Sequence, residues 1–151
     1  LGANQIWAFP ADWSVAKWDG KKLGKKVEKL EKIALGAAEQ SKRNFVPSIT
    51  LFEKKEDFLA QLDQFDSIIV AYEESAKEGE SAALIQAVAG LEKGAKLLFI
   101  FGPEGGLSPA EIERFEAKGA VLAGLGPRIL RAETAPLYAL SALSVLLELE
   151  K

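Results

Sequence analysis

Short apolar segments that predict strands alternate along this chain with segments whose apolar residues recur every three or four positions, as in helices. Five segments predict strands: Gln5–Phe9, Ser48–Phe52, Ser67–Ala71, Lys96–Phe101 and Ala120–Ala123. Five others predict helices: Lys21–Ser41, Lys54–Leu62, Ser81–Leu91, Ser108–Lys118 and Ala135–Leu149. Repeated strand-then-helix order indicates a single α/β domain, with a mostly parallel sheet and helices on both faces.

Three helices carry specific local signals. Ser108, Pro109 and Glu111 match an N-cap, a first-turn proline and the acidic partner of a capping box. Asp19 stands where it would cap the first long helix. The final helix is apolar nearly all round, which predicts burial on more than one side. A partner chain would cover it, or it would be a central core helix.

Composition removes several classes of chemistry. The 151 residues include no Cys and no His, which excludes thiol nucleophiles, zinc fingers and Ser-His-Asp triads. A metal site would therefore need carboxylates and carbonyls. No uncharged apolar stretch is long enough to span a bilayer, and no signal peptide is visible. The chain starts with Leu1 and has no Met, so we expect a piece of a longer protein or a processed chain.

Charge is unevenly distributed along the chain. The net charge is −3, yet residues 1–47 hold nine Lys and Arg against five Asp and Glu. The basic residues of this part are Lys17, Lys21, Lys22, Lys25, Lys26, Lys29, Lys32, Lys42 and Arg43. Two interpretations stay open: a solvated helix face, or a strip that contacts nucleic-acid phosphates.

Two glycine-containing loops follow predicted buried strands, at Phe101–Leu107 and Gly124–Thr134. Neither contains the Gly-Lys-Ser/Thr of a phosphate-binding loop, and Ile129 stands where a dinucleotide fingerprint needs its third glycine. Both loops would lie at the carboxyl ends of parallel strands, where ligands of such sheets bind. Glycines there would let backbone amides and carbonyls read an adenine edge. The alternative is a pair of ordinary turns.

These loops carry a resemblance to a known family. Gly102–Ser108 (GPEGGLS), followed by Leu125–Ala135 (LGPRILRAETA), resembles the 16S ribosomal RNA uridine-N3 methyltransferases. This is the RsmE family of the SPOUT superfamily. An earlier stretch, Ala37–Ser41 with Arg43 and Pro47, also fits it. The match runs in order along almost the whole chain.

The resemblance implies an α/β trefoil knot, S-adenosylmethionine as cofactor, and a cytoplasmic homodimer joined through the knot region and the last helix. The substrate would be a uridine of 16S rRNA in the small ribosomal subunit, methylated at N3, with no membrane and no metal involved. Residues 1–151 would form the methyltransferase domain, without the N-terminal PUA-like RNA-binding domain of the family. Trp13 replaces an Arg found in many members, so it would pack or stack on a base.

The family pattern places the cofactor in three loops at strand ends. The residues it implies are Ala71, Tyr72, Glu73, Ile100, Phe101, Gly102, Glu104, Gly105, Gly106, Leu125, Gly126, Ile129, Leu130 and Arg131. Glu104 has an alternative role, which is to hydrogen-bond loop amides or to sit near a helix N-terminus.

Methyl transfer to N3 needs the base to lose its proton, and a cation near O2 or O4 would stabilise the resulting anion. Arg131 or Arg128 would supply that cation, and Glu133 would take the proton. Structural alternatives stay open: Glu133 favouring the dipole of the last helix, Thr134 capping that helix, and Arg128 binding phosphate.

Three other functions compete with uridine-N3 methylation. The chain could be a SPOUT methyltransferase that acts on another RNA position, or a non-catalytic dimerisation or RNA-docking module. A nucleotide-binding domain of unrelated chemistry is disfavoured by the missing phosphate-loop motifs.

Overall fold

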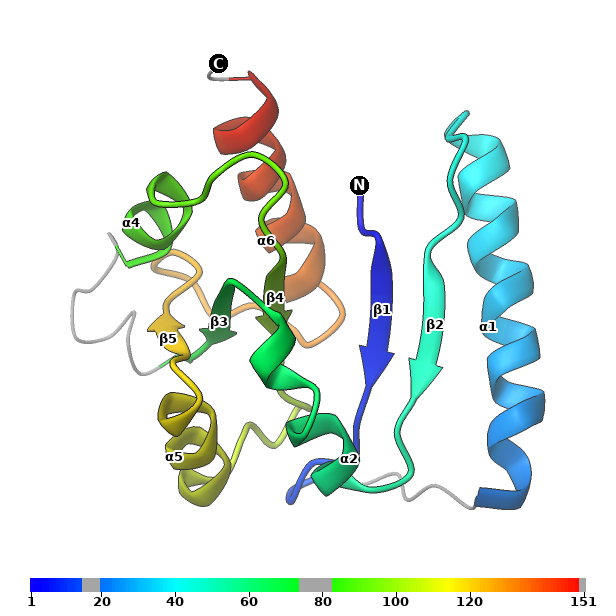
Figure 1. Cartoon of the computed structure of the whole chain (residues 1–151), viewed down its shortest axis with the longest axis horizontal. Coiled ribbons are helices and arrows are strands. Elements are labelled where there is room, and N and C mark those ends of the chain that lie inside the picture. The colour runs from blue at the N-terminus through cyan, green and yellow to red at the C-terminus, as the bar shows by residue number, and fades with distance from the viewer. Residues whose placement is uncertain (15–19, 74–82, 150–151) are drawn as a thin grey trace.

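The computed structural model describes residues 1–14, 20–73 and 83–149 of the chain. The described strands are β1 (Gln5–Ala8), β2 (Ser48–Leu51), β3 (Ser67–Ala71), β4 (Leu97–Ile100) and β5 (Val121–Ala123). The described helices are α1 (Gly20–Gln40), α2 (Lys55–Leu59), α4 (Ala83–Ala89), α5 (Pro109–Ala117) and α6 (Ala135–Ser144) (Figure 1). Each predicted strand and helix is therefore present, in the predicted order.

The helix boundaries differ from the prediction by more than two residues at two places in the described ranges. The predicted Lys54–Leu62 helix ends at Leu59, and a 3-10 turn at Leu62–Gln64 follows it. The predicted Ala135–Leu149 helix widens into a π-turn at Val145–Leu149. Asp19, the predicted cap of α1, and the start of the predicted Ser81–Leu91 helix lie outside the described residues.

All paired strands are parallel, as predicted, but they form two hydrogen-bonded groups in the described ranges. β1 pairs with β2 from Gln5↔Ser48 to Ala8↔Leu51. The second sheet has the order β4-β3-β5, with β3 paired to both neighbours. In Figure 1, β1 lies between β4 and β2, so the two groups are arranged side by side.

Helices cover both faces of the three-stranded sheet. Successive residues of β3 point to opposite sides, so each face contributes its own apolar side chains to a core. Ile68 and Val70 belong to a cluster that buries Phe58 and Leu62 on one side of the sheet. The same cluster includes Ile112 and Phe115 of α5 and Phe58 and Leu59 of α2. Ile69 belongs to the cluster on the opposite face, with Leu84 and Val88 of α4, Ala123 of β5 and Leu143 of α6.

Aromatic contacts attach the two-stranded sheet to the first of these clusters. The ring of Phe9 stacks on Phe58 with 4.3 Å between centroids. Trp7 meets Phe52 and Phe65 edge-on, at 5.3 Å in each case. The two sheets therefore share one core although no ladder joins them.

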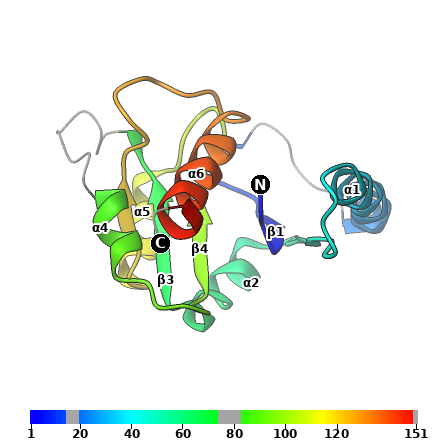
Figure 2. The same cartoon turned by 90° about the horizontal axis from the view of Figure 1, so that it is seen from above.

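Helix α1 stands at one side of the molecule, beside β2 and away from α4 and α6 (Figures 1 and 2). Ala34 and Ala38 are its buried residues. They repeat after four positions, so one narrow stripe of α1 packs against β2 and the rest of its surface is exposed. No helix in the described ranges is long and apolar enough to cross a membrane.

Candidate functional site

Three loops meet at the carboxyl edge of the sheet β4-β3-β5. Tyr72 follows β3, and α4 packs on one face of the sheet, whereas α5, which follows the adjacent β4, packs on the other. Neighbouring strands whose connections diverge in this way open a crevice where ligands of parallel sheets bind. The N–H of Tyr72 donates to the carbonyl of Ala123 at 3.0 Å, which ties the loop after β3 to the end of β5.

The first glycine loop is built tightly behind β4. Ile100 is buried at the end of that strand, and the ring of Phe101 stacks on Phe99 at 4.8 Å. The N–H of Gly106 donates to the carbonyl of Pro103 at 2.8 Å and closes a turn in which Gly106 has φ of +82°. A side chain at Gly102 would meet Leu107 at 2.9 Å, so the loop accepts no larger residue there.

The second glycine loop follows β5. Leu125 packs against the cluster formed by α4 and α6. Gly126 has φ of +81°, and a side chain there would meet the hydroxyl of Tyr138 at 3.0 Å. Ile129 is 77% exposed. This loop is therefore anchored at its start by α6 and projects into solvent further along.

The backbone of the second glycine loop suits a ligand that is bound through amides and carbonyls. From Leu125 to Leu130, no backbone group makes a hydrogen bond to another backbone group of the described residues. Unpaired N–H and C=O groups at a protein surface need water or a ligand as partner. Ala71, at the end of β3, adds a partly buried position beside them. Backbone donors and acceptors of this kind are what the sequence-based expectation of adenine binding requires.

The predicted catalytic residues lie on the exposed part of the same loop. Nε of Arg131 is 3.2 Å from Oε1 of Glu133, and these side chains are 77% and 62% exposed. Arg128 is exposed and forms no ion pair with a described residue. The structure thus brings Arg131 and Glu133 together.

The structure also tests the alternative structural roles of Thr134 and Glu104. Thr134 makes no side-chain cap to α6, so the capping alternative is wrong. Its φ of −88° and ψ of −34° are helical rather than the extended values of an N-cap that accepts from the next turn. Glu104 is exposed and makes no hydrogen bond to loop amides of the described chain. Glu73 is exposed at the end of the loop after β3.

A buried charge cluster behind the first glycine loop was missed in the sequence. The capping box of α5 is present, with Ser108 N–H donating to Oε1 of Glu111 at 2.9 Å and Glu111 N–H donating to Oγ of Ser108 at 3.1 Å. The second oxygen of Glu111 lies 3.0 Å from Nζ of Lys55, which also pairs with Asp12. Oγ of Ser108 donates to Oδ2 of Asp12 at 2.5 Å.

The pKa values of this cluster follow from these contacts. Hydrogen bonds from Lys55 and Ser108 hold the pKa of Asp12 below its ordinary value. Burial alone would lower the pKa of Lys55, but its hydrogen bonds to Asp12 and Glu111 outweigh burial and raise that pKa. Asp12 and Lys55 are therefore held in their ionised forms. A capping box reveals Glu111 from sequence, whereas Lys55 and Asp12 are too distant in sequence to be paired with it.

The cluster also determines what lies against the first glycine loop. A side chain at Gly105 would meet the carbonyl oxygen of Trp13 at 3.2 Å and its Cβ at 3.4 Å. Asp12, fixed by Lys55 and Ser108, holds Trp13 in this position. The space beside Gly105 is thus taken by the chain itself, while half of the Trp13 side chain remains exposed.

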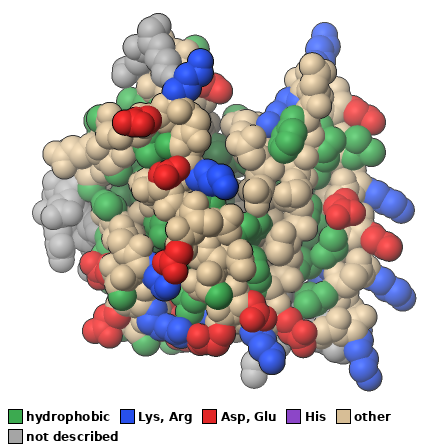
Figure 3. Space-filling model, in the orientation of Figure 1, with side chains coloured by type: hydrophobic (Ala, Val, Ile, Leu, Met, Phe, Trp, Pro, Cys, Tyr) green, Lys and Arg blue, Asp and Glu red, His purple; other side chains and the backbone are tan. Residues whose placement is uncertain are grey.

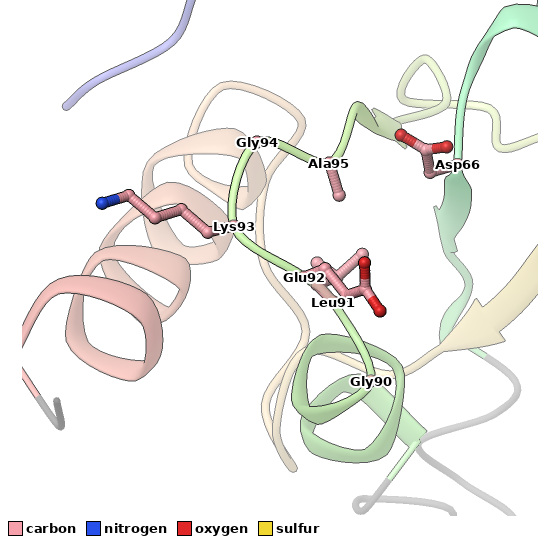
Figure 4. A pocket seen from close by; sticks show the side chains of 7 residues that line it. All are labelled: Asp66, Gly90, Leu91, Glu92, Lys93, Gly94 and Ala95. Atoms are coloured by element: carbon pink, nitrogen blue, oxygen red, sulfur yellow. The ribbon is translucent and has the colours of Figure 1, made fainter.

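A hollow at the opposite edge of the sheet is a separate feature. It is lined by Asp66, which precedes β3, and by the segment Gly90–Ala95, which precedes β4 (Figure 4). Oδ2 of Asp66 accepts a hydrogen bond from the N–H of Lys96 at 2.7 Å. These residues stand at the amino ends of the strands, whereas the three loops of the candidate site stand at the carboxyl ends. The hollow is therefore not part of the candidate site. The described residues include no group of three or more acidic side chains that could hold a metal ion.

Comparison with known proteins identifies the family. The model of the RNA methyltransferase domain matches residues 1–144. The chain is 52% identical over 149 residues to Ribosomal RNA small subunit methyltransferase E of Bacillus subtilis, which covers 99% of this chain and 58% of that protein. The chain thus spans less than two thirds of this relative.

Two crystal structures share the fold. One, described as a hypothetical protein, has a TM-score of 0.88 and 48% identity over 99% of this chain and 58% of its own. Ribosomal RNA small subunit methyltransferase E of Neisseria gonorrhoeae, bound to S-adenosyl methionine, has a TM-score of 0.74 and 25% identity over 97% and 57%. The chain belongs to the RNA methyltransferase domain family, similar to the ribosomal RNA small subunit methyltransferases E, and the family predicted from its two glycine loops is confirmed.

Proposed function

We propose that this chain is the catalytic domain of an S-adenosylmethionine-dependent methyltransferase that acts on N3 of a uridine in 16S rRNA of the small ribosomal subunit. The observation that carries the proposal is the meeting of three loops at the divergence of β3 and β4, one of them with an unpaired backbone. A relative of the same fold binds S-adenosyl methionine at 25% identity.

The cofactor would be held mainly by backbone groups of Ile100–Gly106 and Leu125–Arg131, with Ala71 and Tyr72 completing the pocket. Bound there, it supplies an electrophilic methyl group on a sulfonium. Gly106, which has open space where a side chain would stand, would let the backbone approach the cofactor closely. The protein would contribute position and shape, because transfer of a methyl group needs alignment of the reacting atoms rather than covalent help.

Charged residues of the second glycine loop would remove the proton from the uracil base and stabilise the resulting anion. The N3 proton must leave before the nitrogen can attack the methyl carbon, and the negative charge then spreads to O2 and O4. The guanidinium of Arg131, with Arg128 as second candidate, would stabilise that charge. Glu133 would accept the proton, after its 3.2 Å ion pair with Arg131 opens to admit the base. The C–S bond breaks as the C–N3 bond forms.

The same proposal includes a homodimer and a knotted chain. Leu137, Tyr138 and Val145 are exposed on the last helical segment, next to the second glycine loop. A second copy that covers them would stand beside the candidate site. A trefoil knot formed by the two glycine loops and a place in the cytoplasm are expected on the family resemblance.

Calorimetric titration of this chain with S-adenosylmethionine and S-adenosylhomocysteine tests the cofactor, with ATP and NAD as controls. We expect saturable binding near one site per chain and none for ATP or NAD. Incubation with unmethylated small ribosomal subunits, followed by nucleoside mass spectrometry, tests the substrate. The expected product is 3-methyluridine.

The outcomes separate the competing functions. A different methylated nucleoside would assign the domain to another RNA position. Cofactor binding with no transfer to RNA would instead indicate a non-catalytic module. Absence of cofactor binding by the folded chain would contradict the proposal at its first step.

A further inference from the structure

One face of α1 is lined by five lysines, Lys22, Lys25, Lys26, Lys29 and Lys32, which we call the lysine face. At 3.6 residues per turn these positions fall within an arc of ~120°. The centre of that arc lies ~160° around the helix from the buried Ala34 and Ala38. The lysine face therefore points away from β2, and its side chains protrude along the outer edge of the molecule (Figure 3).

The lysines of this face are exposed and carry no ion pair with any described residue. Some other cations of the described residues are instead committed to the fold. Arg114 pairs with Glu56, Lys118 pairs with Asp63, and Arg43 donates to the carbonyl of Ala3. The lysine face thus has its full charge available for an external partner.

The placement of these lysines does not favour the helix itself. Lysines three or four positions apart repel each other by a few tenths of a kcal/mol. Lys22 also lies in the first turn of α1, which has no acidic residue, although positive charge is unfavourable at a helix N-terminus. Glu28 lies at helical spacing from Lys25 and Lys32 and offsets part of this cost, but Lys26 and Lys29 have no acidic residue three or four positions away. Local stability therefore leaves most of the pattern unexplained, whereas binding of an anionic partner explains it.

The charge of the remaining chain would orient such a partner. Residues 48–151 carry ten Lys and Arg against seventeen Asp and Glu. A polyanion is repelled by that part and attracted to α1, so the molecule would meet it in one orientation. Leu30, Ile33 and Leu35 are exposed on α1, but they are not gathered on a face opposite the lysines, as the apolar residues of a membrane-surface helix are.

We propose that the lysine face binds the phosphate backbone of the RNA substrate. Lys22 to Lys32 span about 15 Å along the helix axis, enough to contact several successive phosphates. Phosphate contacts hold and orient an RNA without reading its sequence. This inference rests on the proposed function for its choice of RNA, but it concerns a surface remote in sequence from the two glycine loops.

The test compares two triple variants that remove the same charge. Lys22→Gln/Lys25→Gln/Lys29→Gln neutralises the middle of the lysine face, and Lys54→Gln/Lys93→Gln/Lys96→Gln neutralises three exposed lysines elsewhere. Glutamine has nearly the helix propensity of lysine, so α1 is preserved. Binding to a fluorescein-labelled RNA hairpin is followed by anisotropy from about 50 to 200 mM salt, a range over which phosphate contacts weaken strongly.

We expect the α1 triple variant to lose at least tenfold in affinity at low salt, and its slope of log K against log salt to shrink by about 2. The control triple variant should stay close to the unmodified chain. Equal losses in both variants, or no RNA binding by the unmodified chain, would overturn the proposal.

Two further measurements separate this inference from other failures. Calorimetry with S-adenosylhomocysteine measures cofactor binding at the glycine loops. A chain that binds RNA through α1 but binds no cofactor would disprove the proposed function and still support RNA binding by the lysine face. Sedimentation with phosphatidylserine vesicles measures binding of the chain to an anionic lipid surface. Vesicle binding that depends on the three lysines, together with unchanged RNA binding, would assign the face to anionic lipid and refute the RNA proposal.

Discussion

Nζ of Lys55 lies 3.0 Å from Oε2 of Glu111, a carboxylate whose side chain is 1% exposed. The pair joins α2 to the first turn of α5. Lys55 also pairs with Asp12, so it links both helices to the segment that carries Trp13 against Gly105. A buried carboxylate is costly unless it is paired and hydrogen-bonded, and Glu111 meets both conditions here.

Replacing Lys55 by methionine should therefore destabilise the fold by about 3 kcal/mol, because it leaves Glu111 buried without its counter-charge. Urea denaturation followed by circular dichroism measures the change. Affinity for S-adenosylhomocysteine should fall as well, since Asp12 and Trp13 lose their support beside the first glycine loop. A variant as stable as the unmodified chain would contradict this account of the cluster.

The pair Glu56–Arg114 offers a matched control. It also joins α2 to α5, with a distance of 2.7 Å, but both side chains are largely exposed and neither touches Asp12 or Ser108. Glu56→Gln should have a much smaller effect on stability and none on cofactor affinity, because exposed pairs are screened by solvent.

Acid should weaken the fold partly through Asp12. Hydrogen bonds from Lys55 and Ser108 lower its pKa in the folded chain, so the folded state binds its proton less readily than the unfolded state. Its contribution is present above its ordinary pKa of 3.8 and is lost as the pH falls through the lower folded pKa. The difference in unfolding free energy between the unmodified chain and Asp12→Asn should shrink below pH 3.8. A pH-independent difference would exclude this role.

Gly126 is expected to tolerate no side chain, for two separable reasons. Its φ of +81° costs an L-residue roughly 1–2 kcal/mol, and a Cβ would meet the hydroxyl of Tyr138 at 3.0 Å. Gly119 has φ of +90° with open space around it. Gly119→Ala therefore measures the backbone cost alone, and Gly126→Ala should lose more in urea denaturation. In a Tyr138→Phe background that excess should diminish, whereas an unchanged excess would show that the contact is irrelevant.

The sequence allowed most of the architecture to be predicted, because strands and helices carry their own periodicity. The run Ser67–Ala71 and the cap at Ser108 were placed correctly for this reason. The lack of hydrogen-bonded pairing between β1 and β4 in the described residues was not foreseen, since the pairing of strands depends on how helices pack against them. The π-turn after Ser144 was not foreseen either, since its sequence remains a good helix.

For the candidate site, local patterns placed the loops and family resemblance supplied the roles. The glycines of both loops come directly after predicted strands in the sequence, so the strand pattern located the loops. The link from Asp12 to Lys55 and Glu111 spans 43 and 99 positions, so no local pattern reports it. The failed cap at Thr134 has a related cause: residue type predicts that a cap is possible, while the backbone angles of the preceding loop decide whether it forms.

Leu137 on α6 should contribute to a dimer interface. Its side chain is 55% exposed in the single chain, and Ser141 and Val145 continue its row at four-residue steps. Leu137→Glu should convert a dimer to a monomer without unfolding it, as measured by light scattering after gel filtration. Ile85 on α4, 56% exposed, serves as control, and Ile85→Glu should leave the dimer intact. A monomeric unmodified chain would contradict the homodimer.

Arg131 should be needed for methyl transfer and not for cofactor binding. Its guanidinium is exposed and forms its ion pair with Glu133, with no other side-chain ion pair to a described residue, so its removal should leave the glycine loops unchanged. Arg131→Ala should abolish transfer to small ribosomal subunits while S-adenosylmethionine affinity stays within tenfold, about 1.4 kcal/mol.

The variant Glu133→Gln separates the two partners of this pair. It keeps the shape of the side chain but cannot take the N3 proton, so turnover should fall at neutral pH and recover as the pH rises and the base loses its proton to solvent. Arg131→Ala should show no such recovery, because the charge that stabilises the anion is still missing. Recovery in both variants, or in neither, would mean that the two residues do not divide the chemistry in this way.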